Sequence, residues 1–511
     1  MKLKNIINTL SLAAVALIAT GCQDTDAQID IVDVDAPAFV SISPAETSVM
    51  LFGEKTITVT FDKNIGFATK NTSKITLNGK PVKDAHVAGV SKSLTITADV
   101  DFNKTQNLHI PAGLIVGPEK KTYDEDIDIT WTIKDLPDND ATAMTKKLGW
   151  GWNLGNHFDT SDVTWGYWDG VATITAAPFT TLAAAGAKTV RIPATWTNHM
   201  DATNVIAPAY LDEVADVVDK AIAAGLNVIL NTHHDAFETA LGEAANDAAK
   251  SEEIKALIET LWTQVATRFA NYGDALMFET FNEIHAGDNW GSGTDAENAL
   301  LNDWNQLAVN AIRATGGNNA TRWIGVAGYA ANIDQTIAKL VIPEDPAKHI
   351  MVGVHCYDPY NFCLAPVTAG IDSWGHNANI ATSVDGANEE YVIAQLYKLR
   401  EAYIEKGIPC YLGEYGCVIQ TTANANAFRK YYLEFFCRAA NLAGIPMFVW
   451  DNNGKATGGN EENGYIDHAT GAFVGDAEIV PMMIKACTDT DQAYWFDTIW
   501  SKSPVYEGSA E

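Results

Sequence analysis

The stretch ALMFETFNEIH, from Ala275 to His285, combines an apolar strand pattern with a polar end. Its first residues are apolar or β-favouring, which is typical of a strand covered on both faces. It finishes with an amide and a carboxylate, Asn282 and Glu283. Because an ionised carboxylate is costly to bury, this position indicates a strand end that opens onto solvent or substrate. Taken alone, the pattern also fits a carboxylate that only hydrogen-bonds to a loop.

Seven other short apolar runs surround this stretch and alternate with amphipathic helical segments, several of which end in Gly. The runs are GWGWNLG, TVRIP, NVILNTHH, RWIGVAG, IMVGVHCY, PCYLGEYG and PMFVW. Strand–helix alternation repeated eight times predicts an α/β domain over residues 143–505, folded as a (β/α)8 TIM barrel.

The region in front of the barrel, residues 37–135, has a different periodicity. Short alternating runs such as KTITVTF and SLTITA are separated by turn signals, including the hairpin dipeptide Asn78-Gly79. Roughly seven strands in about 100 residues predict an all-β immunoglobulin-like sandwich, with Trp131 in its core. We interpret this sandwich as a spacer, with a carbohydrate-binding module as the alternative. Residues 136–142 are the predicted linker.

The N-terminus resembles a bacterial lipoprotein signal. Two lysines precede the apolar run LSLAAVALIA, and TGC follows. The apolar run is too short to span a bilayer stably. We therefore predict a signal peptide over residues 1–21, lipid attachment at Cys22 and an acidic tether over residues 22–36. One departure is Ala19, where a Leu is usual. The expected location is outside the cytoplasm, on the bacterial outer membrane or cell surface, with membrane contact only through the lipid anchor.

The charge balance is strongly acidic, with 64 Asp and Glu against 34 Lys and Arg and a formal net charge of −30. Such a surface repels nucleic acid and anionic lipid and suits a neutral or cationic partner. Six further cysteines match no metal motif: Cys356, Cys363, Cys410, Cys417, Cys437 and Cys487. We expect most of them to be small buried residues, and the sequence leaves open whether they form disulfides. We predict a monomer without metal or cofactor.

In such a barrel the active site forms where the C-terminal ends of the strands meet the following loops. The candidate residues at these ends are Asn156, Arg191, His233, His234, Asn282, Glu283, His355, Tyr357, Glu414 and Trp450. Glu283 and Glu414 belong to strands four and seven and would face each other across the barrel mouth. A carboxylate pair with aromatic neighbours and no metal cluster suits cleavage of a glycosidic bond.

The two carboxyl groups need different protonation states, which their surroundings must impose. Hydrogen bonds from donors such as Arg191 and Tyr357 would favour the charged form of Glu414, as a nucleophile requires. Glu283 lies at a loop where a leaving group can be reached. The sequence His233-His234-Asp235 superficially resembles a metal site. However, adjacent side chains on a strand point to opposite faces, so we predict no shared metal.

Tryptophans are abundant in the predicted loops. Indole faces bind sugar rings well, and we predict Trp196 and Trp290 as walls of substrate subsites. The structural alternative is that these side chains belong to the core.

Seven motifs along the chain resemble, in order, those of glycoside hydrolase family 5, a family of retaining (β/α)8 enzymes that includes many endo-β-1,4-glucanases. The motifs are GWNLGN, VRIP, HH, FNE, HCY, GEYG and FVWDN, and the resemblance covers about residues 147–500. It implies that Glu283 is the acid/base and Glu414 the nucleophile. One departure is Ile284, where many relatives have Pro, which puts the following loop in doubt.

The resemblance also implies roles for the neighbouring residues. Asn282 would bind the 2-hydroxyl of the sugar being cleaved. Trp450 would form the floor of the −1 subsite, where that sugar lies. Arg191, His355 and Tyr357 would position Glu414. One of His233 and His234 would contact the substrate, and the sequence leaves open which.

These inferences predict a retaining endo-acting hydrolase of β-1,4-glucan-type polysaccharide, such as cellulose, mixed-linkage glucan or xyloglucan. One alternative is a β-mannanase of the same fold, because both kinds of enzyme share the strand-end motifs and the shape of the loops decides which polysaccharide is cleaved. A second is a non-catalytic surface glycan-binding protein. The presence of both Glu283 and Glu414 argues against this second alternative.

Overall fold

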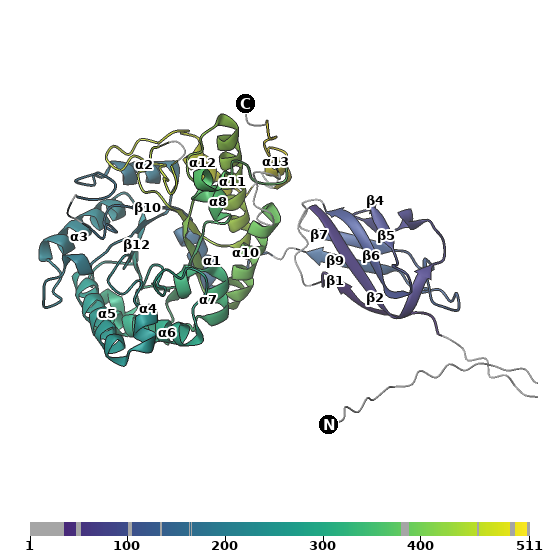
Figure 1. The fold of residues 1–511 in the computed structure, drawn as a ribbon, viewed down its shortest axis with the longest axis horizontal. Coiled ribbons are helices and arrows are strands. Elements are labelled where there is room, and N and C mark those ends of the chain that lie inside the picture. The colour runs from purple at the N-terminus through teal and green to yellow at the C-terminus, as the bar shows by residue number, and fades with distance from the viewer. Residues whose placement is uncertain are drawn as a thin grey trace, which may run out of the picture. The chain divides into compact units, whose positions relative to one another are not determined.

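The computed structural model describes residues 35–46, 53–100, 105–132, 135–162, 164, 166–379, 388–456, 459–490 and 496–507. They form two compact units, one all-β and one a barrel surrounded by helices (Figure 1). The predicted signal peptide, Cys22 and most of the predicted tether lie outside the described residues.

The all-β unit consists of two sheets whose recorded pairings are antiparallel. One contains β1 (Phe39–Ser43), β2 (Gly53–Phe67), β5 (Asp84–His86), β6 (Ser91–Val100) and β8 (Ile115–Val116). The other contains β3 (Thr76–Leu77), β4 (Lys80–Pro81), β7 (Thr105–Ile110) and β9 (Ile127–Thr132). Buried and exposed residues alternate along β6 and β9, as expected for strands with one face in a core. The predicted all-β unit is confirmed.

The predicted hairpin at Asn78-Gly79 is also present. Both residues have positive φ, 51° and 75°, and Leu77 of β3 pairs with Lys80 of β4. Two consecutive residues with positive φ are what a type I′ turn requires. Trp131 of β9 is 1% exposed and lies in the core, as predicted.

The second unit is a closed barrel of eight parallel strands in chain order. The strands are β10 (Trp150–Asn153), β11 (Thr189–Ile192), β12 (Asn227–Asn231), β13 (Leu276–Glu279), β14 (Ile324–Val326), β15 (Ile350–Cys356), β16 (Cys410–Tyr415) and β17 (Met447–Val449). Each falls within one of the eight apolar runs, which confirms the predicted TIM barrel.

Helices surround these strands (Figure 1). The longer helices are α1 (Asp140–Leu148), α2 (Ala177–Ala185), α3 (Pro208–Ala223), α5 (Ala248–Arg268), α6 (Asp295–Ala314), α7 (Ile333–Lys339), α10 (Glu389–Ala402), α11 (Ala423–Ala443) and α12 (Ile479–Thr488). The shorter ones are α4 (Leu241–Asn246), α8 (Tyr360–Cys363), α9 (Pro366–Ala369) and α13 (Phe496–Trp500).

The predicted linker is too long at its C-terminal end. Residues 140–142 belong to α1, because the side chain of Asn139 caps that helix by accepting from the backbone N–H of Thr142. A side chain that caps a helix start typically stabilises it by about 1 kcal/mol. The predicted linker therefore included the first residues of this helix.

The barrel interior is filled by large apolar side chains from several strands together with Met144 and Leu148 of α1. Tyr411 of β16 occupies the space beside two glycines of neighbouring strands, Gly325 and Gly353. A Cβ atom at Gly325 would collide with the Tyr411 hydroxyl, and one at Gly353 would lie 2.9 Å from it. These glycines let the Tyr411 ring lie inside the barrel, where its hydroxyl reaches the polar groups above.

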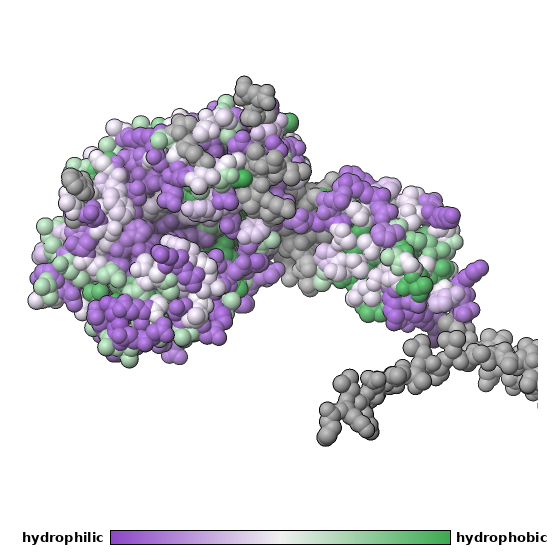
Figure 2. All heavy atoms as spheres, viewed as in Figure 1, coloured by the Kyte–Doolittle hydropathy of each residue, from purple (hydrophilic) through white to green (hydrophobic). Residues whose placement is uncertain are grey.

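The visible face of the barrel unit is mostly hydrophilic, whereas apolar residues gather in a patch on the all-β unit (Figure 2). Among the described residues, no helix combines the length and apolar character needed to cross a membrane.

Candidate active site

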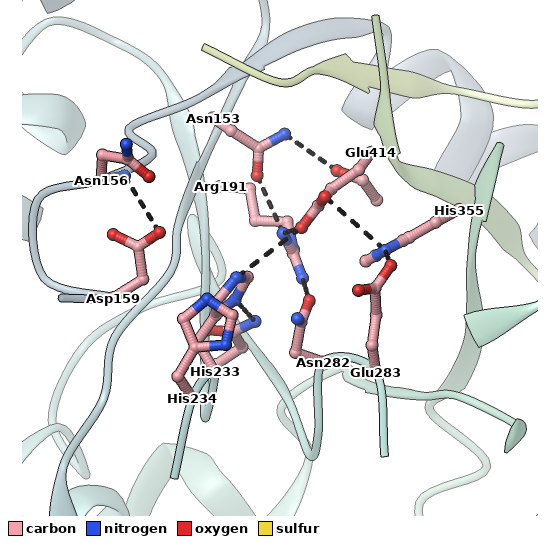
Figure 3. A network of polar contacts seen from close by, with 12 residues as sticks. Asn153, Asn156, Asp159, Arg191, His233, His234, Asn282, Glu283, His355 and Glu414 are labelled. Atoms are coloured by element: carbon pink, nitrogen blue, oxygen red, sulfur yellow. Dashed lines mark hydrogen bonds and ion pairs between the residues drawn. The ribbon is translucent and has the colours of Figure 1, made fainter. Parts of the chain in front are cut away.

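Arg191, on β11, is the centre of the polar network at the C-terminal end of the barrel (Figure 3). Its side chain is fully buried. Nη1 donates to Asn153 Oδ1 at 2.9 Å and to Glu414 Oε1 at 2.7 Å. Nη2 donates to Asn282 Oδ1 at 2.8 Å and to Glu279 Oε1 at 2.7 Å. One guanidinium therefore links β10, β13, β16 and the loop that follows β13.

Glu414, near the end of β16, is held on both carboxylate oxygens. Arg191 binds Oε1, and the Tyr357 hydroxyl donates to Oε2 at 2.8 Å. His233 Nε2 lies 3.9 Å from Oε1, and His355 Nδ1 lies 3.7 Å from Oε2. The Glu414 side chain is only 7% exposed. The predicted contacts of Arg191 and Tyr357 with Glu414 are thus present.

Glu283 lies in the loop beyond β13 and is more accessible, with 19% of its side chain exposed. Its Oε1 is 2.6 Å from His355 Nδ1. Burial opposes a charge on His355, but the Glu414 and Glu283 carboxylates raise its pKa above the ordinary value. One carboxylate oxygen of Glu283, one of Glu414 and one ring nitrogen of His355 all lie within 4.8 Å of one another. His355 therefore bridges the two carboxylates instead of serving Glu414 alone.

Glu279, the last residue of β13, was missed by the sequence analysis, which treated the run around it as uniformly apolar or β-favouring. Its side chain is 2% exposed and accepts from Arg191, from Asn231 Nδ2 at 2.9 Å and from the Tyr411 hydroxyl at 2.6 Å. Burial opposes ionisation, but Arg191 lowers the pKa of Glu279 below its usual value. A carboxylate inside an apolar strand must be paired with a cation or hydrogen-bond donors. The position of Glu279 within the apolar run was therefore the signal that could have identified it.

The structure separates the roles of the two adjacent histidines. Buried His233 stacks on Trp450, with ring centroids 5.7 Å apart and an interplanar angle of 6°. Its Nδ1 lies 3.2 Å from the amide nitrogen of Asn231, which also donates to Glu279. Since that amide nitrogen is a donor, Nδ1 accepts and the proton remains on Nε2. Burial, with the nearby positive charges, holds the pKa of His233 well below its ordinary value.

His234 is instead cationic. Burial opposes this charge, but a hydrogen bond of 2.9 Å to Glu238 and the charge of that carboxylate raise the pKa of His234 to about 9. The His234 ring lies 5.9 Å from that of the exposed Trp168. His233 therefore lies near the Glu414 carboxylate, whereas His234 lies beside the exposed indole of Trp168.

The prediction that His233 and His234 point to opposite faces is wrong. Their rings lie 4.5 Å apart at 80°, because β12 ends at Asn231 and strand alternation no longer applies. Donor atoms of both histidines and Asp159 lie within 4.8 Å of one another. However, the Asn231 contact places the His233 proton on Nε2, and the raised pKa of His234 favours its protonated form, so neither imidazole offers a free lone pair to a shared ion. The third residue of the His233-His234-Asp235 sequence, Asp235, is instead held by the backbone. It accepts from the N–H groups of Trp196 and Thr197 at 2.8 and 2.7 Å.

The predicted role of Trp196 as a subsite wall is wrong. Its side chain is fully buried, and its indole N–H donates to the Asn231 carbonyl at 2.9 Å. A residue inside the core cannot offer a ring face to a sugar. Trp290, in contrast, is 56% exposed and stacks on His285 at 4.0 Å. It lines a cavity of about 220 Å³ that also touches Glu283 and Tyr357, so its proposed role stays a prediction.

Trp450 and Asn156 are the two remaining predicted contacts. Trp450 follows β17, and its backbone N–H donates to the Tyr415 carbonyl at 2.8 Å. Asn156 adopts a positive φ of 59°, and its backbone N–H donates to Asp159 Oδ2 at 3.0 Å. Burial raises the pKa of Asp159 to about 6. The Asn156 side chain lies apart from the Arg191 network (Figure 3).

A buried ionic cluster anchors the loop that carries Trp450, and the sequence analysis missed it. His468 Nδ1 lies 2.9 Å from Asp169 Oδ2, and its Nε2 lies 3.4 Å from Asp451 Oδ1. All three side chains are fully buried. Burial opposes the charge, but the hydrogen bond to Asp169 and the ion pair with Asp451 raise the pKa of His468 to about 9. The cluster ties the loop after β17 to the loop after β10.

Comparison with known proteins places this geometry in context. Residues 151–456 match the model of the family "Cellulase (glycosyl hydrolase family 5)". Endoglucanase A from Clostridium longisporum is 32% identical over 343 residues, which are 65% of this chain and 63% of that protein. Endoglucanase 1 from Ruminococcus albus is 31% identical over 404 residues, which are 76% of this chain and 92% of that protein.

Solved structures give the same picture. A native family 5 cellulase affiliated with the Bacteroidetes and linked with a polysaccharide utilization locus has 38% identity and a TM-score of 0.68, over 73% of this chain and 99% of that one. A family 5 lichenase variant from Caldicellulosiruptor sp. F32 in complex with cellotetraose has 32% identity and a TM-score of 0.60, over 70% of this chain and 97% of that one.

Proposed function

The chain belongs to glycoside hydrolase family 5 and is a glycoside hydrolase, and we propose that it cleaves β-1,4-glucan-type polysaccharides by an endo-acting, retaining mechanism. The candidate substrates are cellulose, mixed-linkage glucan and xyloglucan. The endoglucanases among its relatives and the lichenase bound to cellotetraose support a glucan substrate.

The distance between the two carboxylates carries the retaining proposal. One carboxylate oxygen of Glu283 and one of Glu414 lie within 4.8 Å of each other. Retaining enzymes hold their carboxyl groups about 5–5.5 Å apart, whereas inverting enzymes need about 6.5–9.5 Å to admit a water molecule. The short separation leaves room for direct attack by one carboxylate and little room for an intervening water.

The surroundings of the two carboxylates support a different role for each. Glu414, which accepts from Arg191 and Tyr357, attacks the anomeric carbon as the leaving oxygen departs. Glu283, which is more exposed, gives its proton to that oxygen. The resulting glycosyl–enzyme ester is hydrolysed when Glu283, now a carboxylate, takes a proton from water that attacks the anomeric carbon. Glu414 then leaves as a carboxylate, and the product keeps the β configuration.

The neighbouring side chains would bind the sugar being cleaved. Asn282 Oδ1 is occupied by Arg191, so its amide N–H groups are available to a sugar hydroxyl. Trp450 would form the floor of the −1 subsite, and His233, stacked on Trp450, would donate from Nε2. Trp290 lies on the Glu283 side and would form a wall for the leaving sugar. The predicted contact of Asn156 with substrate is retained as part of this proposal.

Proton NMR during hydrolysis of a soluble oligosaccharide tests the mechanism. The first-formed reducing end should be the β-anomer, with the α-anomer appearing later by mutarotation. Initial formation of the α-anomer would require an inverting route and would remove Glu414 as nucleophile.

Product analysis on purified polysaccharides tests the substrate. Cellulose, mixed-linkage glucan, xyloglucan and mannan should be compared at equal mass, with products sized during early turnover. Internal cleavage of a glucan is expected. Preferential cleavage of mannan would favour the β-mannanase alternative, and binding without cleavage would favour a glycan-binding protein.

We also propose a lipid anchor at Cys22 that holds a monomeric enzyme on the bacterial outer membrane or cell surface, on the basis of the signal-like N-terminus. Cys22→Ala should move the protein from the membrane fraction to the soluble fraction without changing its specific activity. Full-length protein recovered in the soluble fraction without lipid on Cys22 would contradict the anchor. Sedimentation of the soluble variant tests the monomer.

A further inference from the structure

We propose that Glu279 is a positioning residue for the nucleophile Glu414. Glu279 fixes the guanidinium of Arg191, and the positive charge of that guanidinium is divided between Glu279 and Glu414. The inference rests on the proposed function, since it takes Glu414 to be the attacking carboxylate. Glu279 itself lies below the catalytic pair and acts only through Arg191.

Arg191 divides its donors between two carboxylates. It approaches Glu279 with Nε at 3.1 Å and Nη2 at 2.7 Å from Oε1. This side-on contact leaves Nη1 for Glu414 Oε1 at 2.7 Å. Because the guanidinium is planar, fixing Nε and Nη2 also fixes the direction of Nη1. Glu279 therefore orients the main donor to Glu414, together with the Asn153 and Asn282 oxygens that also accept from this guanidinium.

Glu279 is itself held rigidly. Its Oε1 also accepts from Asn231 Nδ2 at 2.9 Å, and its Oε2 accepts from the Tyr411 hydroxyl at 2.6 Å. The space for the Tyr411 ring exists because residues 325 and 353 are glycines. A buried carboxylate with donors on both oxygens is a well-defined anchor, as positioning at a reactive site requires.

Charge sharing gives the arrangement a second consequence. Arg191 and Glu279 are 0% and 2% exposed, so their charges interact through a poorly screened interior. With Glu279 neutralised, the full positive charge of Arg191 would act on Glu414. A carboxylate that is bound more tightly as an anion is a weaker nucleophile and is harder to protonate.

Other charged or titratable groups also face Glu414 and remain unchanged in such a variant. They are His233 at the end of β12, His355 and Tyr357 at the end of β15, and Glu283 and Asp159 in the loops after β13 and β10. The difference between variant and wild type therefore isolates the charge of Glu279.

Glu279→Gln tests the inference through the pH dependence of kcat/KM, whose acidic limb reports the essential base of the free enzyme. We expect this limb to move to lower pH by roughly one unit. At neutral pH, kcat/KM should fall by about 10²-fold, the scale expected for a small misplacement at a reactive site. Simple loss of Arg191 from Glu414 would instead move the limb to higher pH, and a shift in that direction or no shift overturns the proposal.

Glu279→Asp keeps the charge but retracts the carboxylate by one methylene group. It should lower kcat/KM while leaving the acidic limb near its wild-type position, and a limb that moves as in Glu279→Gln would overturn the charge-sharing argument. This variant also provides the test should Glu279→Gln not fold, which thermal unfolding would reveal.

Glu389→Gln is the matched control. Glu389 is also 2% exposed and hydrogen-bonded, but its partners are His376 and Tyr431. Its variant should lose stability without moving the acidic limb. A 2-deoxy-2-fluoro glycoside, which traps the nucleophile covalently, separates the two hypotheses. Label on another residue contradicts the proposed function, whereas label on Glu414 with an unmoved limb in Glu279→Gln contradicts only this inference.

Discussion

The two carboxylates of the proposed active site are held in opposite ways, although they lie close together. Glu414 is 7% exposed and accepts from a permanently charged arginine and a tyrosine hydroxyl. Glu283 is 19% exposed, and its recorded side-chain partner is a single histidine. The difference matches the chemistry that we propose. The group that must stay anionic has donors on both oxygens, and the group that must exchange a proton keeps one side open.

His355 connects the two environments. Its Nδ1 lies 2.6 Å from Glu283 and 3.7 Å from Glu414, and both carboxylates raise its pKa. A histidine between the two groups can respond when a proton leaves Glu283 or when Glu414 loses its charge in the covalent intermediate. Glu283 and Glu414 are therefore coupled through His355.

The largest effect should come from Glu414→Ala, which removes the carboxylate that we propose as the attacking group. We expect activity to fall by several powers of ten on the natural polymer and also on an aryl glycoside with an activated leaving group. Initial rates on both substrates measure this effect. Added azide should give an α-glycosyl azide or no product, because it would attack from the face that Glu414 vacates. A β-azide would reverse the two assignments.

Glu283→Ala should remove the proposed acid/base group and leave the proposed nucleophile in place. Its activity on polymer should fall by about 10²–10⁴-fold, the usual worth of acid–base help. An activated aryl glycoside needs no proton, so a rapid burst should be followed by slow turnover. Azide should restore turnover and give a β-glycosyl azide, because azide needs no base. Equal losses on both substrates without azide rescue would contradict the acid/base role.

The sequence predicted both carboxylates because each lies at or just beyond the end of a recognisable strand, in a fold that brings strand ends together. Glu279 was hidden for the opposite reason, since it lies within the apolar run and its partners Arg191 and Tyr411 are far away in the chain. Trp196 was misassigned because a loop tryptophan can pack inward, and only the tertiary structure shows its burial.

Tyr357→Phe should remove one of the hydrogen bonds to Glu414, the proposed nucleophile. A hydrogen bond to a charged group is worth about 1.5–3 kcal/mol, which corresponds to a loss of roughly 10–100-fold in kcat/KM. The loss should be similar for polymer and activated substrate, because the Tyr357 hydroxyl donates to Glu414. A loss confined to substrates with poor leaving groups would place Tyr357 on the acid/base side instead.

His468→Gln should affect stability more than chemistry, because the His468 cluster lies behind the loop that carries Trp450. The pKa of His468 is about 9 in the fold against an ordinary value of 6.5. A raised pKa stabilises the fold below pH 6.5, and this stabilisation is lost as pH rises towards 9. The difference is about 3 kcal/mol by linkage.

Denaturant unfolding of both proteins between pH 6 and pH 9.5 measures this contribution. The stability gap between wild type and His468→Gln should shrink as pH rises. A gap that is constant with pH would mean that His468 acts through packing alone.

The smallest effect should follow removal of the all-β unit. Arg191, Glu279, Glu283 and Glu414 all contact partners inside the barrel unit. A shortened chain beginning at Asp135 should therefore keep the kcat/KM of the full chain on soluble cello-oligosaccharides. A chain beginning at Asp140 lacks the Asn139 side chain that caps α1, and it should be about 1 kcal/mol less stable without altered chemistry. Steady-state rates and thermal unfolding of the two shortened chains separate these effects. A large loss of rate in the Asp135 chain would mean that the all-β unit takes part in the reaction, and the contrast between Glu414 and Glu283 would then no longer account for catalysis by itself.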